Sequence, residues 1–428
     1  MGFGDFFDEP KFDFDKERKT FIDNLNLLKT MSVQEQTLYK KWQEFNADVY
    51  SMTQKASKFK RINNSIWTPS DITNKEQTLI ELLALEPYVE MLEQGNAKDN
   101  ETWTLVRRLI HTMEFTANPG RNLKFFVKDK VTGKLLGVIC LGSDVTSLGA
   151  RDKYIGWSLD NKFKDGKLKH TAIGTTICCA QPLGYNFLGG KLIAALVTSS
   201  VVRDAWKKLY GQTLVGMSTT SLYGIHSMYN SIPLWRTMGK SVGRIALKPD
   251  DATYEVWHDW VRENMESEYK KATTQKEGVS GPPTGVKQKT INLIFRAVGI
   301  KASDYEHGFQ RGIYYADMYE NGKEFLRGEI EEKDLKMKKK YAEDTDYIMN
   351  WWKPKAIKRY TKLFDEGRLK PEKLFYGDIV GKTWEETKEM YLSEVGRWTY
   401  LILQKKKIPI KSIHIRYLFI QTLHICVT

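Results

Sequence analysis

Apolar residues recur at helical spacing through the first quarter of the chain. Phe21, Leu25 and Leu28 are three or four positions apart, and Trp103 begins a second series with the same spacing. Such spacing places apolar side chains on one face of a helix. The breakers at residues 118–120, Asn-Pro-Gly, end the pattern. The sequence therefore predicts a helical N-terminal region over residues 1–118.

From Asn122 the pattern changes to that of strands and short helices. Two β-rich runs flank a turn at Gly133 and predict a hairpin. A helix that opens on two glycines and stops at Gly211 follows further along. The remaining expected elements are strands at 154–158, 175–182, 214–220 and 241–247, and helices at 189–210 and 226–238. The pattern predicts an α/β core over residues 119–249 with a mixed, mostly antiparallel sheet.

The rest of the chain is expected to be mainly helical. Residues 250–290 are predicted to hold one amphipathic helix, from Asp250 to Thr274, and then a linker rich in Gly and Pro. Residues 291–404 are charged and predict a helical C-terminal domain, and residues 405–428 form a basic, then apolar, tail of undecided role. The predicted fold class is thus α/β (α+β), a central mixed-sheet domain with helical extensions at both ends.

The order of strands and helices in the core resembles the GNAT acyltransferase superfamily. In that fold a strand leads through a glycine-rich turn into a helix whose free N–H groups meet the pyrophosphate of coenzyme A. The resemblance implies a cofactor site for an acyl-coenzyme A-like donor at Leu188, Gly189, Gly190 and Lys191. The alternative is that the two glycines serve only the packing of the helix.

Charge points to a polyanionic partner. The formal net charge is +13, with a pI near 9.2, which favours a polyanion such as DNA, RNA or a nucleotide cofactor; a basic protein without such a partner is the alternative. The four cysteines form no C-x-x-C pair and the seven histidines are scattered, so no metal site is expected. No signal peptide or membrane-length apolar run is visible, which predicts a cytoplasmic protein without a membrane partner.

Two spaced motifs resemble the A-subunit family of the Druantia anti-phage system and its phage-encoded relatives. The first runs from Ala150 to Trp157, with the pattern R-D-x-x-I-G-W, and the second from Trp235 to Arg244, with the pattern W-x-x-x-G-x-[ST]-x-G-R. The resemblance implies a phage or anti-phage context linked to nucleic acid. It also implies likeness to a Mom-type phage enzyme, which modifies adenine in DNA on a GNAT-like fold.

Three residues are candidates for catalysis. In many GNAT enzymes a tyrosine protonates the leaving thiolate, and it lies four residues before the glycine that ends the last helix. Trp235 occupies that position here. An indole cannot donate a proton in this way. Tyr229 is the nearest replacement as proton donor, with Asp152 as base and Arg244 as phosphate anchor. We expect the three to converge beside Gly189 and Gly190. The alternative places Tyr229 in the core and Arg244 against a surface carboxylate.

A second set could contact the nucleic acid. Arg151 could grip phosphate, or form a structural pair with Asp152. Two tryptophans could stack a flipped base or fill the core, and a serine could line the cleft or belong to a turn. The predicted set is Arg151, Trp157, Arg203, Ser221 and Trp235. The function predicted is transfer of an acyl or carbamoyl-type group to a base amine; the alternatives are a non-catalytic DNA-binding protein of the same fold and a phage structural or packaging protein.

Overall fold

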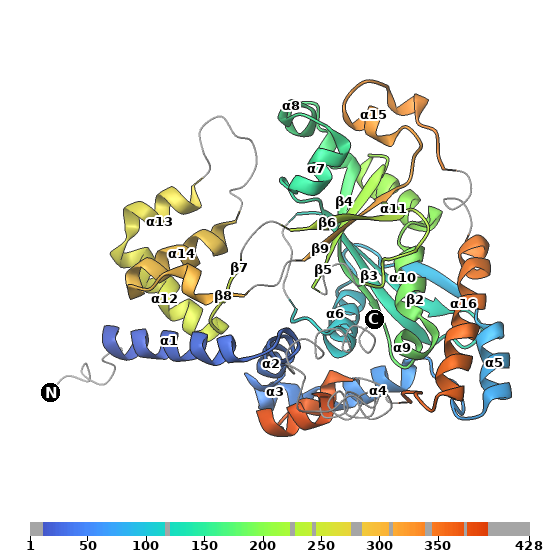
Figure 1. Cartoon of the computed structure of the whole chain (residues 1–428), viewed down its shortest axis with the longest axis horizontal. Coiled ribbons are helices and arrows are strands. Elements are labelled where there is room, and N and C mark those ends of the chain that lie inside the picture. Colours follow the sequence, from blue (N-terminus) through green and yellow to red (C-terminus); the bar gives the residue numbers. More distant parts are fainter. Residues whose placement is uncertain are drawn as a thin grey trace, which may run out of the picture. The chain divides into compact units, whose positions relative to one another are not determined.

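The computed structural model divides the chain into two compact units (Figure 1). The first combines Met1–Gln36 with Val242–Phe309, and the second combines Thr37–Ser241 with Gln310–Thr428. The structure describes residues 12–115, 120–222, 227–241, 245–274, 285–307, 311–338, 345–371 and 375–392. The candidate residue Arg244, most of the predicted linker and the tail at 405–428 lie outside these ranges.

The first unit is mainly helical. Its elements are α1 (Phe14–Thr30), β7 (Ile245–Ala246), α12 (Asp251–Asn264), α13 (Glu266–Thr273), α14 (Val286–Val298) and β8 (Glu306–His307). Phe21 packs edge-on against Trp257 and Phe295 at 6.0 and 5.6 Å between ring centroids. The predicted apolar face of the first helix is therefore confirmed. The single helix expected from Asp250 to Thr274 is instead two helices, because the backbone leaves helical geometry at Met265.

The second unit is built on a seven-stranded sheet with the order β1-β2-β3-β4-β5-β9-β6. The β4–β5 pair is parallel, and the other pairs of this sheet are antiparallel. The strands are β1 (Pro87–Met91), β2 (Asn122–Asp129), β3 (Leu135–Ser143), β4 (Thr171–Cys179), β5 (Gly216–Ser221), β6 (Trp235–Lys240) and β9 (Gly312–Asp317). The helices are α2 (Val33–Asn46, which begins in the first unit), α3 (Val49–Gln54), α4 (Ala56–Ser65), α5 (Lys75–Ala84), α6 (Ala97–Ile110), α7 (Gly149–Ile155), α8 (Leu159–Phe163), α9 (Leu183–Phe187), α10 (Gly189–Leu196), α11 (Ser200–Tyr210), α15 (Gly322–Leu326) and α16 (Thr345–Asp365).

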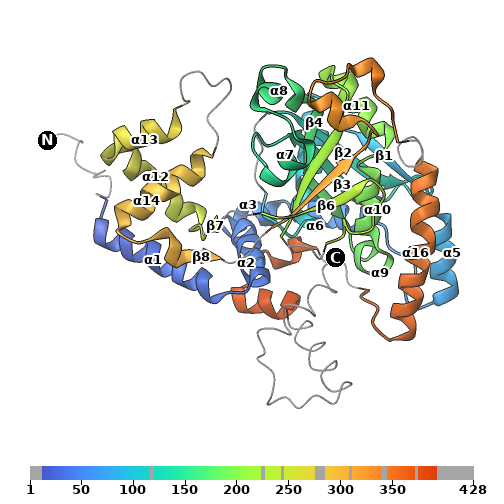
Figure 2. The same cartoon turned by 45° about the horizontal axis from the view of Figure 1, so that its top comes forward.

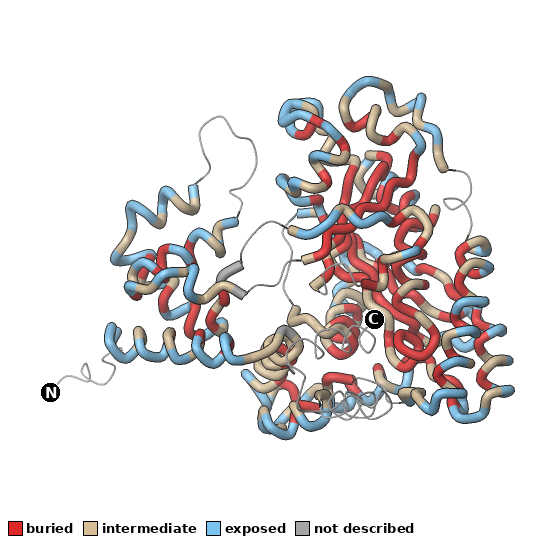
Figure 3. The backbone as a smooth tube through the Cα atoms, in the orientation of Figure 1, coloured by how far each residue is buried: buried red, intermediate tan, exposed pale blue. Residues whose placement is uncertain are grey.

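Helices cover both faces of this sheet, and the buried backbone is concentrated in its strands (Figure 3). Side chains alternate between the faces, as they do in any strand. Phe125 packs into the core shared with α10 and α11, whereas Phe126 packs into the core shared with α6. The indole of Trp103 on α6 donates to the carbonyl of Phe125 at 3.0 Å. Helix α16 lies beside α5 and α9 (Figure 2).

Two local predictions are wrong. Residues 154–158 are not a strand, since α7 continues to Ile155 and Gly156 ends it in the left-handed conformation at φ 78°. The predicted helix at 226–238 is replaced by a turn and by β6, with residue 226 itself outside the described ranges. Pro233 and the positive φ of Leu234 explain this difference, because neither suits a helix interior.

Other predicted elements are cut or supplemented. The helix expected at 189–210 is two helices, because Ser199 has an extended backbone conformation. The hydroxyl of Thr198 donates to the carbonyl of Ala195 at this break. The strand expected at 241–247 contributes only β7, which pairs with β8 rather than with the main sheet. Strand β9, in a region expected to be helical, takes the place between β5 and β6.

The overall fold class is confirmed: the protein is mixed α/β, with a central mixed sheet and helical regions toward both ends. The sheet extends beyond residues 119–249, because β1 and β9 lie outside that range. The predicted domain boundaries therefore remain a prediction. Among the residues that the structure describes, no helix has the length and apolar character needed to cross a membrane.

Candidate functional site

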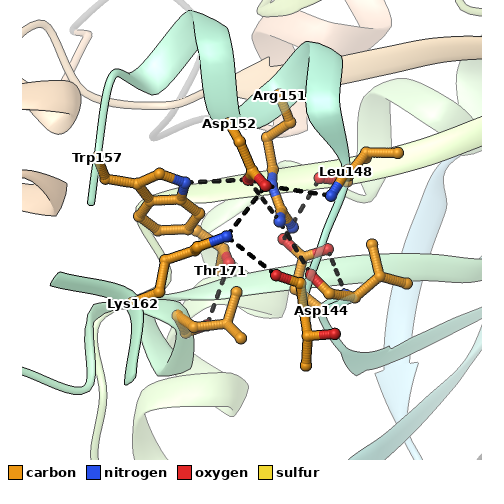
Figure 4. Close-up of polar contacts among 11 residues, drawn as sticks. Asp144, Leu148, Arg151, Asp152, Trp157, Lys162 and Thr171 are labelled. Carbon is orange, nitrogen blue, oxygen red and sulfur yellow. Dashed lines mark hydrogen bonds and ion pairs between the residues drawn. The ribbon is translucent and has the colours of Figure 1, made fainter. Parts of the chain in front are cut away.

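The first motif forms a buried cluster of charges around α7 (Figure 4). The side chain of Arg151 is fully buried and pairs with Asp144 and Asp152, each at 2.7 Å. It also donates to the carbonyl of Val145 at 2.9 Å. Lys162 also pairs with Asp152, at 3.1 Å, so two cations and two carboxylates balance one another in the cluster. Such balance is needed because burying an unpaired charge is costly. This geometry supports the structural interpretation of the Arg–Asp pair.

Asp152 receives hydrogen bonds on both carboxylate oxygens. Arg151 and the indole of Trp157 donate to Oδ1, the indole at 2.9 Å, while Lys162 and the backbone N–H of Leu148 donate to Oδ2 at 3.1 and 3.2 Å. Burial acts to raise the pKa of Asp152, but Arg151 and the other donors outweigh it and lower the pKa. A carboxylate so engaged is a poor proton acceptor. The role of Asp152 as a base stays a prediction, and these contacts weigh against it.

Short-range features of the chain assemble this cluster. Gly156 ends α7, and Ser158 then begins α8 with a capping box completed by Asn161. The turn between the two helices brings Lys162 back toward Asp152 (Figure 4). Trp157, between them, is 8% exposed and packs against the guanidinium of Arg151 at 5.2 Å. Its ring is thus committed to the core, which favours the structural alternative over base stacking.

The glycines of the second predicted site are required for packing. A Cβ on Gly189 would lie 2.5 Å from the sulfur of Cys179, and one on Gly190 would lie 3.0 Å from the sulfur of Met228. The residue before them, Leu188, has a φ of 55°, and its carbonyl accepts from the indole of Trp352 at 3.0 Å. The beginning of α10 is therefore tightly surrounded, and this supports the packing alternative for the glycine pair.

Lys191 connects α10 by hydrogen bonds to the segment that precedes β6. Its ammonium donates to the carbonyls of Met228, at 3.2 Å, and Asn230. Burial, together with the nearby charge of Lys355, lowers the pKa of Lys191. The ammonium thus has carbonyl partners but forms no ion pair with a carboxylate of the described residues.

An open pocket of about 270 Å³ lies between the beginning of α10 and α16. Five of its lining residues are cationic and none is acidic. The lining consists of Leu188, Lys191, Ser231, Trp351, Lys355, Lys358, Arg359 and Lys362. We call this set the basic pocket. It includes Leu188 and Lys191 from the predicted cofactor site, but Gly189 and Gly190 do not line it.

Tyr229 and Trp235 are both in the core. Their rings lie 5.0 Å apart, and the Trp235 indole donates to the carbonyl of Ala194 at 2.8 Å. Tyr229 shares a hydrogen bond with Thr219, and burial raises the pKa of Tyr229. Trp235 therefore has no free face for a base, whereas the Tyr229 hydroxyl meets Thr219 within β5.

The remaining candidates do not gather into one centre. Arg203 is 6% exposed and donates to the sulfur of Met337 at 2.8 Å, and Ser221 is buried at the end of β5. Among the described residues, no hydrogen bond or ion pair joins Asp152 to Tyr229. The convergence of these two with Arg244 stays a prediction, since Arg244 lies outside the described residues.

Sequence reasoning missed the cations of α16. Lys355, Lys358, Arg359 and Lys362 have the spacing i, i+3, i+4, i+7, which places them on one face of a helix. That spacing was visible in the sequence, but it did not show that the face lies beside α10. The partners Asp144 and Lys162 were missed as well, and only the fold brings them to α7.

Comparison with known proteins identifies the family. The family model described as Druantia protein DruA matches residues 28–328, more than half of the chain. The curated Druantia protein DruA of Escherichia coli (strain UMEA 4076-1) is 28% identical over 299 residues, which cover 64% of this chain and 70% of the relative. No solved structure matches. The chain therefore belongs to the Druantia protein DruA family.

Proposed function

We propose that this chain serves in anti-phage defence and acts on nucleic acid with a GNAT-like core. The Druantia name of its relative supports the first part, and the net charge of +13 supports a polyanionic substrate. The observation that carries the GNAT-like assignment is the strand order, with one parallel step in an otherwise antiparallel sheet. The reaction proposed is transfer of an acyl or carbamoyl-type group to a base amine.

The parallel strands β4 and β5 separate after a short stretch of pairing. Strands β4 and β5 pair only from Thr171 to Ile173 with Gly216 to Ser218, although both strands continue further. The pairing of β3 with β4 also shifts register at Thr175, which is a bulge of the kind that often lies next to active sites. Backbone groups freed where strands separate are able to meet a ligand. This separation is the place where we propose the chemistry.

Tyr229 is the proposed proton donor at this place. Thr219, which shares a hydrogen bond with it, donates across to the carbonyl of Gly174 at 3.0 Å and so links β5 to β4. Burial raises the pKa of Tyr229, so its phenol carries its proton at neutral pH but is a weaker acid than an exposed tyrosine. In transfer to a base amine, the bond between the acyl carbon and its leaving group would break as the new C–N bond forms. Tyr229 would give its proton to the leaving group and regain one from the amine.

A coenzyme-like donor does not fit the beginning of α10 as the structure has it. Met228 packs on Gly190, and Lys191 is held by two carbonyls of the same segment. The same packing favours a second candidate function, a non-catalytic protein of this fold that only binds nucleic acid.

Mass spectrometry of nucleosides separates the two candidates. DNA and RNA from cells expressing the chain should contain a base of increased mass, which Tyr229→Phe abolishes because it removes the proton donor, together with the hydrogen bond to Thr219. Trp235→Phe, a buried neighbour without an ionisable proton, controls for damage to the core. Unmodified nucleosides with the unaltered chain would contradict the transferase and leave the binding protein.

A further inference from the structure

The basic pocket combines many cations with a small volume. Four of its cations come from α16 and one, Lys191, from α10, while Trp351 and Leu188 supply apolar surface. Its volume of about 270 Å³ is below the roughly 300–1,000 Å³ of sites that enclose a whole small ligand. The pocket therefore suits part of a longer polyanion better than a complete coenzyme.

The lysines of this pocket lack acidic partners. Lys355, Lys358 and Lys362 form no ion pair with any carboxylate of the described residues. Some exposed lysines of the same unit are paired, as Lys207 is with Glu332 at 2.7 Å, and others, such as Lys98 and Lys130, stand apart from a cluster of cations. Like charges gathered without counter-charges repel one another, so an anion that enters the pocket relieves this repulsion.

The row of cations on α16 is long enough to follow a short segment of one nucleic-acid strand. Lys355 and Lys362 are seven residues apart, which is about 10 Å along a helix. One strand of a duplex carries about three phosphates over that length. Trp351, one turn before Lys355, adds a half-buried aromatic ring to the row, and the ammonium of Lys355 lies over that ring at 4.8 Å. Cations beside an aromatic ring at the surface are typical of sites for unpaired strands, whose bases stack on the ring.

We propose that the basic pocket binds the phosphate backbone of single-stranded nucleic acid. The inference rests on the proposed nucleic-acid substrate and adds where, and in which form, the strand is held. Lys355, Lys358 and Lys362 contact successive phosphates, and an unpaired base takes the place of the Lys355 ammonium on the ring of Trp351. The cations of α16 lie outside residues 28–328, so the family model does not cover this half of the pocket.

Fluorescence anisotropy of the full chain with a labelled 20-nucleotide oligo-dT tests the proposal. Lys355→Gln with Lys358→Gln should weaken binding on the order of tenfold at low salt, and should flatten the slope of log K against log salt by about 1.4, or 0.7 for each phosphate contact. The matched control is Lys98→Gln with Lys130→Gln, two exposed lysines that remove the same charge from α6 and the β2–β3 turn. Thermal melting should be the same for both double variants.

Each outcome has one meaning. Binding by the unaltered chain that the pocket variant keeps, or that both double variants lose equally, overturns the pocket but leaves the proposed function. No binding of single strand or duplex at low salt overturns both. Competition by ATP as effective as by unlabelled oligo-dT at equal phosphate concentration would make the pocket a nucleotide site instead. Tighter binding of duplex than of single strand would overturn the assignment of the pocket to single-stranded nucleic acid.

Discussion

Two groups of basic residues in the same unit differ in what surrounds them. Around α7, Arg151 and Lys162 are buried and face the carboxylates of Asp144 and Asp152. In the basic pocket, Lys355 and its neighbours on α16 are exposed and face other cations. Both groups could be taken for phosphate-binding sites from their composition alone.

The difference in pairing separates structure from binding. A buried ion pair recovers the cost of desolvation only while both partners stay in place. If one partner turned to bind a ligand, the other would be left buried without a counter-charge. Exposed cations without carboxylates keep their hydration and their charge until an anion arrives. The motif with the clearest family resemblance therefore stabilises the fold, whereas the less distinctive lysines of α16 have the properties of a binding surface.

The largest expected effect comes from removing Arg151. Arg151→Ala leaves Asp144 buried without its counter-charge, and we expect a loss of about 3–5 kcal/mol in the free energy of unfolding. Lys355→Gln, on the exposed face of α16, should change this free energy by less than about 0.5 kcal/mol. Urea unfolding followed by circular dichroism measures both. Equal effects of the two substitutions would remove the distinction between the regions.

An intermediate effect is expected for the indole of the first motif. Trp157→Phe keeps a ring in place but removes the donor to Asp152, and should cost about 1.5–3 kcal/mol, because the acceptor is charged. Trp351→Phe is the control: the structure gives its indole no hydrogen bond among the described residues, so a smaller cost is expected. The same unfolding assay applies. A Trp351 variant as unstable as the Trp157 variant would mean that the pocket ring is also structural.

The pH dependence of stability should follow Asp152. Its pKa is lower in the folded chain than the ordinary value of 3.8. The stability it contributes is therefore fully present above that ordinary value, and is lost as pH falls through the lower folded pKa. Unfolding free energies between pH 6 and pH 2.5 should fall less steeply for Asp152→Asn than for the unaltered chain. Identical curves would show that the carboxylate is not held by charge.

The sequence predicted elements well where local pattern decides the structure. The hairpin of β2 and β3, the break at Gly211 and the apolar face of α1 follow from periodicity and turn residues alone. Strand β9 was missed because its surroundings are charged and helical, although its run Ile-Tyr-Tyr-Ala has strand character. Its place in the sheet depends on pairing with β5, which is far away in the chain.

The candidate site was predictable only in part for the same reason. The neighbours Arg151 and Asp152 suggested their own pairing, but Asp144 and Lys162 reach them through the turns of α7 and α8. The basic spacing on α16 was visible as well. That it meets Lys191, which is about 160 residues earlier in the sequence, follows from tertiary packing that no local pattern contains.

The smallest expected effect tests the backbone of the two regions. In the α7 region the left-handed position is a glycine, Gly156. The non-glycine residues with positive φ in the described chain are Leu188, Ser231 and Leu234. Leu188 and Ser231 line the basic pocket. Strain of this kind clusters at functional sites. Ser231 is exposed at a φ of 59°, so Ser231→Gly removes about 1–2 kcal/mol of steric cost and adds about 0.5–1 kcal/mol of chain entropy.

The net result for Ser231→Gly is a gain of about 0.5 kcal/mol in the free energy of unfolding, since relief of the left-handed strain slightly exceeds the added entropy of the unfolded chain. Ser57→Gly, at an exposed position of α4, makes the same chemical change in a helix and should instead destabilise by about 0.5 kcal/mol. Opposite signs in paired urea titrations would locate the strain at the pocket. Destabilisation by both variants would mean that the turn tolerates serine without cost, and that the pocket is no more strained than the region around α7.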